Sequence, residues 1–288
     1  MANDITIRSL HTLEDFHRCV QIAREVWADA ELDSEPYVTY VIAHHTGGQV
    51  IGAFDGQTMV GFVKAFVGLR DKTTYIHSHM AAVLASHRDR RIGRQLKLAQ
   101  REDALRRGVR LIEWTFDPLE TKNAHFNINR LGAISRRYIP NFYGITTSPL
   151  HRGMPTDRLL VEWHLDSPRV LAAIAELSPE PKDCPAHIHL PNAVLTPARD
   201  FASHNSGGST FQTVGGREPA SPEPQARPGE SAVMQPALDA NPDDDPLLQL
   251  QSRLREEFAH WFGKGYAATG VRSTLSGVDY CLSPYSDF

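Results

Sequence analysis

The sequence lacks the features that would tie the chain to a membrane or to nucleic acid. No apolar run approaches the roughly 18 to 20 residues that a membrane-spanning helix needs. Residues 1–4 lead directly into a short strand and a polar amphipathic helix, where a signal peptide would have a hydrophobic segment. The formal net charge is only −4, so neither sign dominates. We therefore expect a cytoplasmic protein that binds neither a membrane nor nucleic acid.

Cysteine is scarce as well. The three cysteines are Cys19, Cys184 and Cys281. An odd number at wide spacing favours reduced thiols over a disulfide framework. Two histidine pairs, His77 with His79 and His187 with His189, lack further ligands at a spacing suited to zinc. The sequence thus predicts neither disulfides nor a bound metal.

What the sequence does contain is a strand, a basic turn and a helix in immediate succession between His77 and Leu105. Residues 75–84 are rich in β-branched and small apolar side chains, which favours a buried strand. Ile92, Leu96 and Ala99 then recur at helical spacing. The turn between strand and helix carries the cations Arg88, Arg90, Arg91 and Arg94. Backbone N–H groups at a helix start coincide here with positive charge, which predicts a phosphate site.

The hexapeptide Arg88-Asp89-Arg90-Arg91-Ile92-Gly93 resembles the pyrophosphate loop Gln/Arg-x-x-Gly-x-Gly/Ala of the GNAT superfamily of acyl-CoA N-acyltransferases. Arg91 stands where the family has its first glycine. Glycine permits positive φ and close approach of the backbone to phosphate, so an arginine there must hold an ordinary φ or accept some strain.

A second block strengthens the resemblance. Residues 111–116 read as a buried strand, Asp117-Pro118 end it, and residues 123–133 follow as a short helix that ends at a glycine. Ala124, Ile128 and Gly132 keep the spacing of the corresponding GNAT segment. The longer pattern, which includes the strand, the Asp-Pro break and the short helix, is similar to a branch of predicted acetyltransferases. The family often has a catalytic tyrosine at the position of Ile128, so that assignment fails here.

The remaining pattern predicts an α/β (α+β) protein with the GNAT fold. We expect a central mixed, mostly antiparallel sheet, helices on both faces and a V-shaped split between two parallel strands. Helices are predicted over residues 13–27 and 37–46, and strands over 5–8, 49–54, 59–69 and 159–165. The predicted organisation is a GNAT core over 1–168, a proline-rich extension over 169–202, a disordered insertion over 203–245, and a C-terminal helix plus β-hairpin over 246–288 that docks on the core.

The resemblance implies that acyl-CoA binds in the opening between the strands that end near Val83 and Phe116, and that an amine attacks the thioester directly. Its co-substrate would be acetyl-CoA or another acyl-CoA, without a metal, and its acceptor a small-molecule amine bound by a monomer or homodimer. The alternative is a non-catalytic acyl-CoA-binding or regulatory module. The implied cofactor-binding residues are Val83 and Ala85 for the pantetheine, Arg88, Arg90, Arg91, Ile92, Gly93 and Arg94 for the pyrophosphate, and Asn123 and Phe126 near the thioester.

Candidates for proton transfer and acceptor binding come from the strands and loops beside this opening. Glu113 and Asp117 alternate along one strand face, as His77 and His79 do on the preceding strand, and any of them could accept the proton of the amine. Strand histidines and loop tyrosines also have an ordinary structural reading as packed side chains. The candidate acids are Tyr138 and Tyr143. The predicted acceptor-binding residues are His79, Asp157 and Arg158.

Overall fold

A computed structural model of the chain describes residues 4–27, 35–146, 151, 153–177, 181, 184–192 and 245–285. The predicted insertion 203–245 lies outside these residues apart from Asp245, which caps a helix. No helix within the described ranges is long and apolar enough to cross a membrane.

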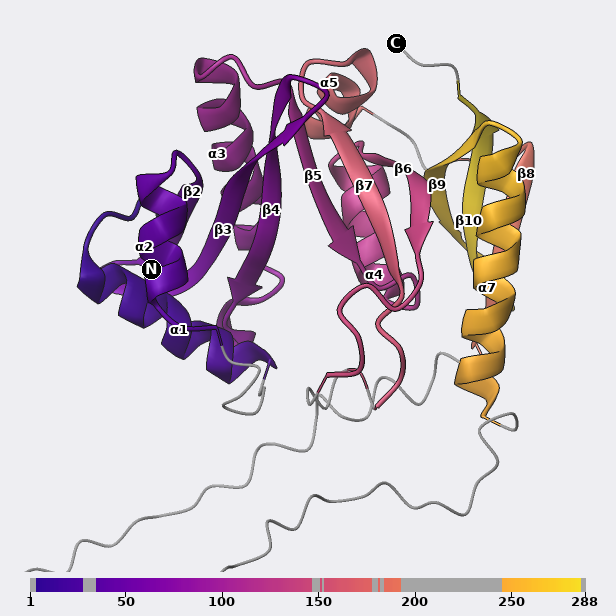
Figure 1. Cartoon of the computed structure of the whole chain (residues 1–288), viewed down its shortest axis with the longest axis horizontal. Coiled ribbons are helices and arrows are strands. Elements are labelled where there is room, and N and C mark those ends of the chain that lie inside the picture. The colour runs from indigo at the N-terminus through magenta and orange to yellow at the C-terminus, as the bar shows by residue number, and fades with distance from the viewer. Residues whose placement is uncertain are drawn as a thin grey trace, which may run out of the picture.

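One ten-stranded sheet organises the molecule (Figure 1). Its strands lie in the order β1-β2-β3-β4-β5-β7-β6-β9-β10-β8. Their bounds are β1 Ile5–Ser9, β2 Gln49–Asp55, β3 Thr58–Arg70, β4 Thr73–Val83, β5 Leu111–Phe116, β6 Ile134–Ile139, β7 Arg158–His164, β8 Ala186–Pro191, β9 Tyr266–Ser273 and β10 Gly277–Pro284. Between described strands, the β4–β5 pair is parallel and the other pairs are antiparallel. This confirms the predicted mixed, mostly antiparallel sheet.

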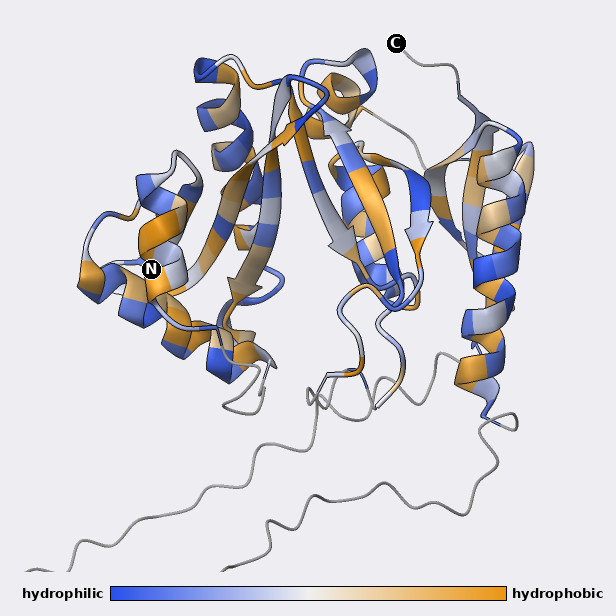
Figure 2. Ribbon diagram, in the orientation of Figure 1, coloured by the Kyte–Doolittle hydropathy of each residue, from blue (hydrophilic) through white to orange (hydrophobic). Residues whose placement is uncertain are grey.

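Helices cover the sheet on both faces. Their bounds are α1 Leu13–Trp27, α2 Val38–His45, η1 Ala85–His87, α3 Ile92–Arg106, α4 Thr121–Ala124, η2 His125–Arg130, α5 Pro168–Ile174 and α7 Pro246–Gly263. The helix α7 buries Leu250, Leu254 and Phe258 and turns its polar side outward, as the mixed colours along it in Figure 2 illustrate. Figure 1 shows α7 in front of β9 and β10, while β5 and β7 in the middle have no helix in front of them. The middle of this face is therefore not covered by a helix.

Three elements differ from the sequence prediction. β6 was not predicted, because a register shift between Ser135 and Arg137 breaks the alternation of its side chains. β8 lies within the proline-rich stretch and pairs with β10 at the edge of the sheet, where prolines are tolerated. The helix predicted over residues 123–133 is a short α-helix that continues as the π-helical η2.

The prediction that all cysteines are reduced is wrong for two of them. Cys184 and Cys281 form a disulfide, while Cys19 is free and buried. The bonded residues are 97 positions apart in sequence. The pairing of Cys281 with His187 across β10 and β8 brings residue 184 alongside. Sequence spacing cannot reveal a partner that depends on strand register.

Candidate functional site

The parallel strands β4 and β5 separate soon after they meet. They pair only at Ile76 with Ile112 and at His77 with Glu113, after which β4 continues to Val83 and β5 to Phe116. Two diverging parallel strands leave backbone groups without ladder partners, and an extended ligand can use such groups as an added strand. The geometry therefore provides the predicted V-shaped split, with the half-buried Val83 at its wide end.

The helix α3 begins at the wide end of this split. Arg91 precedes it with φ 59°, in the left-handed region that glycine favours, so the arginine accepts the strain that the sequence left open. Among the described residues no side chain caps α3, and its first N–H groups point away from the helix. A β-carbon added to Gly93 would meet nothing within 4 Å. The start of α3 thus offers free donors beside open space, as an anion site requires.

The arginines of this loop have protein partners. Arg90 pairs with Asp55 at 3.1 Å, and Arg91 pairs with Glu176 at 2.9 Å. Arg94 donates to the carbonyl of Ile174, and Arg88 donates weakly to the carbonyl of Val83 at 3.4 Å. These contacts orient the cations around the start of α3. The two ion pairs are exposed or partly exposed, and such pairs cost little to rearrange when a phosphate arrives.

The other predicted cofactor residues frame the same split. Ala85 is exposed at the start of η1, directly after β4. Ile92 is buried under α3 and serves the core. Asn123 is exposed on α4 just beyond the end of β5, and Phe126 packs partly buried against the core. Ile128, the position of the family tyrosine, is fully buried.

A polar cluster lies on the open face beside the split. The imidazole of His79 on β4 lies 3.6 Å from the carboxylate of Glu35, which also pairs with the buried ammonium of Lys64. The ring of Phe66 packs against His79 with centroids 5.6 Å apart. Burial lowers the pKa of His79, although Glu35 opposes the effect. A neutral imidazole oriented by a carboxylate can accept a proton at neutral pH.

Tyr143 approaches the split from the β6–β7 loop. Its hydroxyl lies 3.2 Å from the hydroxyl of Thr115 on β5, and its side chain is partly exposed. Arg158 lies over the ring of Tyr143 and contacts His151 at 2.9 Å. Since Thr115 lies two residues beyond the last paired position of β5, the phenol is placed where the strands diverge.

The two acidic candidates for the base are in different surroundings. Glu113 is 1% exposed and is held by both nitrogens of Arg70 at 2.7 Å, with Arg137 at 3.4 Å. Guanidinium N–H groups thus occupy both oxygens of this carboxylate. Burial raises the pKa of Asp117 to about 6, although its contact with the N–H of Leu119 opposes the rise. A carboxyl group with this pKa can exchange a proton near neutral pH.

Tyr138 and Asp157 are brought together, but in a clasp that holds the C-terminal helix. The buried carboxylate of Asp157 accepts two hydrogen bonds from Arg255 of α7, at 2.6 and 2.8 Å. It also accepts from the hydroxyl of Tyr138 at 2.7 Å and from the N–H of Asn141 at 2.9 Å. The ring of Tyr138 stacks on Phe258. These contacts use the polar groups of both candidates. Tyr138 and Asp157 therefore hold α7 against the β6–β7 loop beside the site.

The sequence did not single out Lys97, which lies under the vertex of the split. Its ammonium donates to the hydroxyl of Ser78 at 2.7 Å and lies 3.9 Å from the ring centre of Trp114. Ser78 and Trp114 are the first residues of β4 and β5 beyond the last parallel pair. No carboxylate contacts this ammonium among the described residues, and burial lowers the pKa of Lys97 to about 7. Only the sheet register could have identified this position.

We expect Lys97→Met to stabilise the protein by about 1–3 kcal/mol at pH 6, because an unpaired buried cation is costly to protonate. The pKa is about 7 in the folded protein and about 10.4 in the unfolded chain. The free-energy cost of burying the charged ammonium therefore has its full value below pH 7 and decreases as the pH rises to about 10. Urea unfolding at pH 6 and pH 9 measures the difference, with the exposed Lys122→Met as control. A variant less stable than wild type at both pH values would show that the contacts with Ser78 and Trp114 dominate.

Part of the chain is similar to a known protein family. Residues 13–132 match the family model described as Acetyltransferase (GNAT) family. Solved structures with similar folds include ribosomal-protein-S18-alanine N-acetyltransferase from Escherichia coli, at 16% identity and TM-score 0.46, over 57% of this chain and 96% of that chain. NAA60 from Arabidopsis thaliana in complex with acetyl-CoA has 16% identity and TM-score 0.48, over 57% and 100%. None of the curated proteins compared with the chain matches it.

The matched segment begins with α1 and runs to the glycine that ends the α4–η2 segment, so it contains the split of β4 and β5 and the basic start of α3. Over residues 13–132, which contain the split and the basic start of α3, the chain is similar to the acetyltransferase (GNAT) family.

Proposed function

We propose that the protein transfers an acetyl group from acetyl-CoA to the amine of a small molecule by direct attack in a ternary complex. The observation that carries this proposal is the parting of β4 and β5 in front of the uncapped start of α3. The pyrophosphate would bind the N–H groups around Ile92 and Gly93, with Arg88 and Arg90 nearby. The pantetheine would run along β4 at Val83 and Ala85. The thioester would then lie between His79 and Thr115.

The residues at the split suit the proton transfers that this reaction needs. An ammonium must lose a proton before its nitrogen can attack, and His79 backed by Glu35 can accept it. The nitrogen then forms a bond to the carbonyl carbon, the carbon–sulfur bond breaks, and the nitrogen gives up a second proton, which can replace the one that Tyr143 donates. Tyr143 can supply the proton that converts the leaving thiolate to the thiol of CoA. Asp117 is the alternative base. Holding amine and thioester together would provide most of the acceleration.

Gly93→Leu tests the cofactor site. The added side chain enters open space, and leucine is a better helix former than glycine, so we expect stability to stay within about 0.5 kcal/mol of wild type. We expect the same side chain to obstruct the phosphate and weaken acetyl-CoA binding by about tenfold or more. Calorimetric titration with acetyl-CoA measures the loss. Gly263→Leu, at a helix end that is equally open, is the matched control.

The outcomes separate the two functions that the sequence allows. Unchanged affinity in Gly93→Leu would refute the phosphate site at α3. Release of CoA from acetyl-CoA in the presence of a panel of small amines would support the transferase. If acetyl-CoA binds and stabilises the wild-type protein but no amine accelerates CoA release, the non-catalytic binding module is the better reading.

A further inference from the structure

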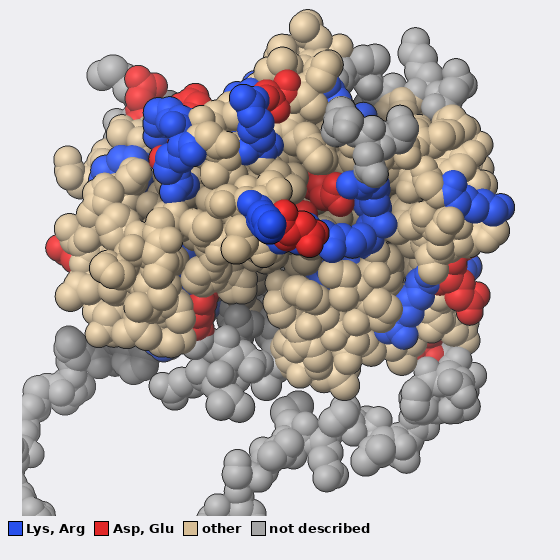
Figure 3. All heavy atoms as spheres, turned by 45° about the horizontal axis from the view of Figure 1, so that its top comes forward, with Lys and Arg blue, Asp and Glu red and all other residues tan. Residues whose placement is uncertain are grey.

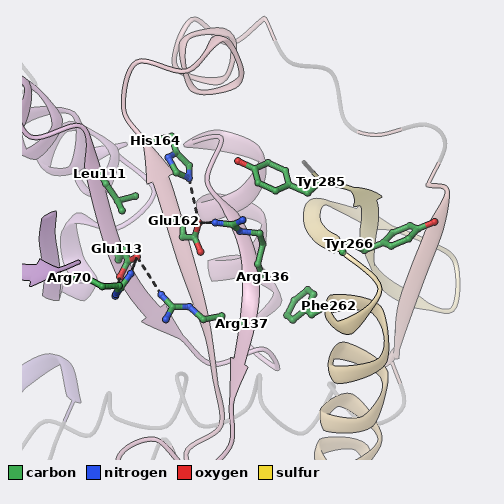
Figure 4. Close-up of a pocket in the computed structure, with 11 residues that line it drawn as sticks. Arg70, Leu111, Glu113, Arg136, Arg137, Glu162, His164, Phe262, Tyr266 and Tyr285 are labelled. Atoms are coloured by element: carbon green, nitrogen blue, oxygen red, sulfur yellow. Dashed lines mark hydrogen bonds and ion pairs between the residues drawn. The ribbon is translucent and has the colours of Figure 1, made fainter. Parts of the chain in front are cut away.

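A cavity lies on the same face of the sheet as His77 and Glu113, the last parallel pair before the split. It has a volume of about 530 Å³, within the range of small-molecule sites. Its floor is formed by β5, β7 and β6, and its far wall by Phe262, Tyr266 and Tyr285 at the C-terminal end of the chain (Figure 4). Figure 3 shows basic and acidic side chains gathered in a hollow in the middle of the molecule.

The floor of this pocket holds two carboxylates in an unfavourable position. Glu113 on β5 and Glu162 on β7 are direct cross-strand partners, and both side chains are buried. Like charges directly opposite each other destabilise a sheet, and buried carboxylates are costly without cations. Burial alone would raise the pKa of Glu162, but hydrogen bonds from His164 and Arg136 outweigh it and hold the pKa at about 2.

Three arginines converge on these two carboxylates. Arg70 and Arg137 hold Glu113, and Arg136 donates to Glu162 at 2.6 Å. Among the described residues that line the pocket, there is thus one more arginine than there are carboxylates. The exposed fractions of the arginine side chains are 41% for Arg70, 45% for Arg137 and 32% for Arg136, so each keeps a surface toward the pocket. Buried ion pairs add little stability, but they fix guanidinium groups in place.

Fixed guanidinium groups with excess charge suit a carboxylate ligand. Arg137 is the best placed of the three, because its single contact with Glu113 is 3.4 Å long and its side chain is the most exposed. Arg158, the arginine that the sequence predicted for an acceptor carboxylate, is instead engaged with His151 and the ring of Tyr143. We therefore assign the contact with an acceptor carboxylate to Arg137 on β6 and not to Arg158 at the start of β7.

We propose that this pocket binds the carboxylate of the amine acceptor, with Arg137 as the principal contact. The inference rests on the proposed acetyl transfer, because it takes the position of the amine from the split. Thr115 lies two residues beyond Glu113 on the same strand face, roughly 7 Å away. An acceptor whose amine reaches the split and whose carboxylate reaches Arg137 needs about five to six single bonds between them. The substrate class is thus an extended amino acid with its amine remote from its carboxylate.

A series of ω-amino acids tests the span. Initial rates of CoA release with glycine, β-alanine, γ-aminobutyrate, δ-aminovalerate and ε-aminocaproate should rise toward the longer members. The kcat/KM of the best member should exceed that of its amide by about tenfold or more. Arg137→Gln should remove this preference, mainly through KM, and leave acetyl-CoA affinity unchanged. Arg106→Gln, an exposed arginine at the far end of α3, is the matched control.

Direct binding of valerate, which has the carboxylate but no amine, distinguishes this inference from the proposed function. Valerate should bind the wild-type protein in NMR titrations and bind Arg137→Gln at least about tenfold more weakly. Acetylation of amines and amides alike, without valerate binding, would overturn the pocket and leave the transferase standing. Valerate binding that depends on Arg137, without acetylation of any amine, would overturn the transferase and keep the anion site.

Discussion

Asp157→Ala is expected to destabilise the protein by about 3 kcal/mol. The substitution removes the buried carboxylate that joins the β6–β7 loop to α7, and it leaves the Arg255 guanidinium and the Tyr138 hydroxyl without their partner. Removing one member of a buried ion pair costs roughly 3–5 kcal/mol. We expect the lower end of that range, because Arg255 is 34% exposed and can recover water. Urea unfolding followed by far-ultraviolet circular dichroism measures the change.

Asp166→Ala serves as the control for this experiment. Asp166 pairs with Arg110 on the surface, where ion pairs contribute little, so its loss should change stability by less than about 0.5 kcal/mol. An equally small effect of Asp157→Ala would mean that the apolar contacts of α7, such as those of Phe258, hold the helix without the clasp. A large effect would identify Asp157 as a structural residue, in contrast to its predicted role in acceptor binding.

Local sequence signals were sufficient for much of the fold. The strands predicted over residues 49–54 and 59–69 form the β2–β3 hairpin, and the apolar spacing of residues 92–99 predicted α3. The order of the two motifs resembles that of the GNAT superfamily, and this resemblance predicted the parallel pair β4–β5. β6 could not be found in this way, because the consecutive Arg136 and Arg137 interrupt the alternation of its side chains, and the register shift at this point is not visible in the sequence.

The site was only partly predictable for a related reason. The basic loop is contiguous in sequence, so Arg91 and Gly93 could be found from their spacing. The partners that define the chemistry are distant: Glu113 is held by Arg70, 43 residues away, and Arg91 meets Glu176, 85 residues away. Such contacts follow from strand order and register, which single-sequence patterns do not encode. His79 was found as one of an alternating pair, but Glu35 beside it was not.

His79→Gln should reduce kcat by about a hundredfold or more if His79 is the base of the proposed reaction. Glutamine keeps hydrogen-bonding capacity near Glu35 but cannot accept a proton at neutral pH. His45→Gln, an exposed histidine at the end of α2, should leave kcat unchanged. CoA release at saturating acetyl-CoA measures both variants. A loss below threefold in His79→Gln would exclude His79 as the base and favour the alternative, Asp117.

The pH dependence of kcat/KM provides the sharper distinction between the two bases. Burial lowers the pKa of His79 below the ordinary value of 6.5, with Lys64 and His77 acting in the same direction and Glu35 opposing them. The neutral imidazole is the active form, so the rate should fall as the pH drops through this lowered pKa and stay level above it. Asp117, with its pKa raised to about 6, would also produce an acidic limb. Because each substitution removes only its own group, the limb should disappear in His79→Gln and persist in Asp117→Asn. The reverse result would identify Asp117 as the proton acceptor and leave His79 to orient the amine.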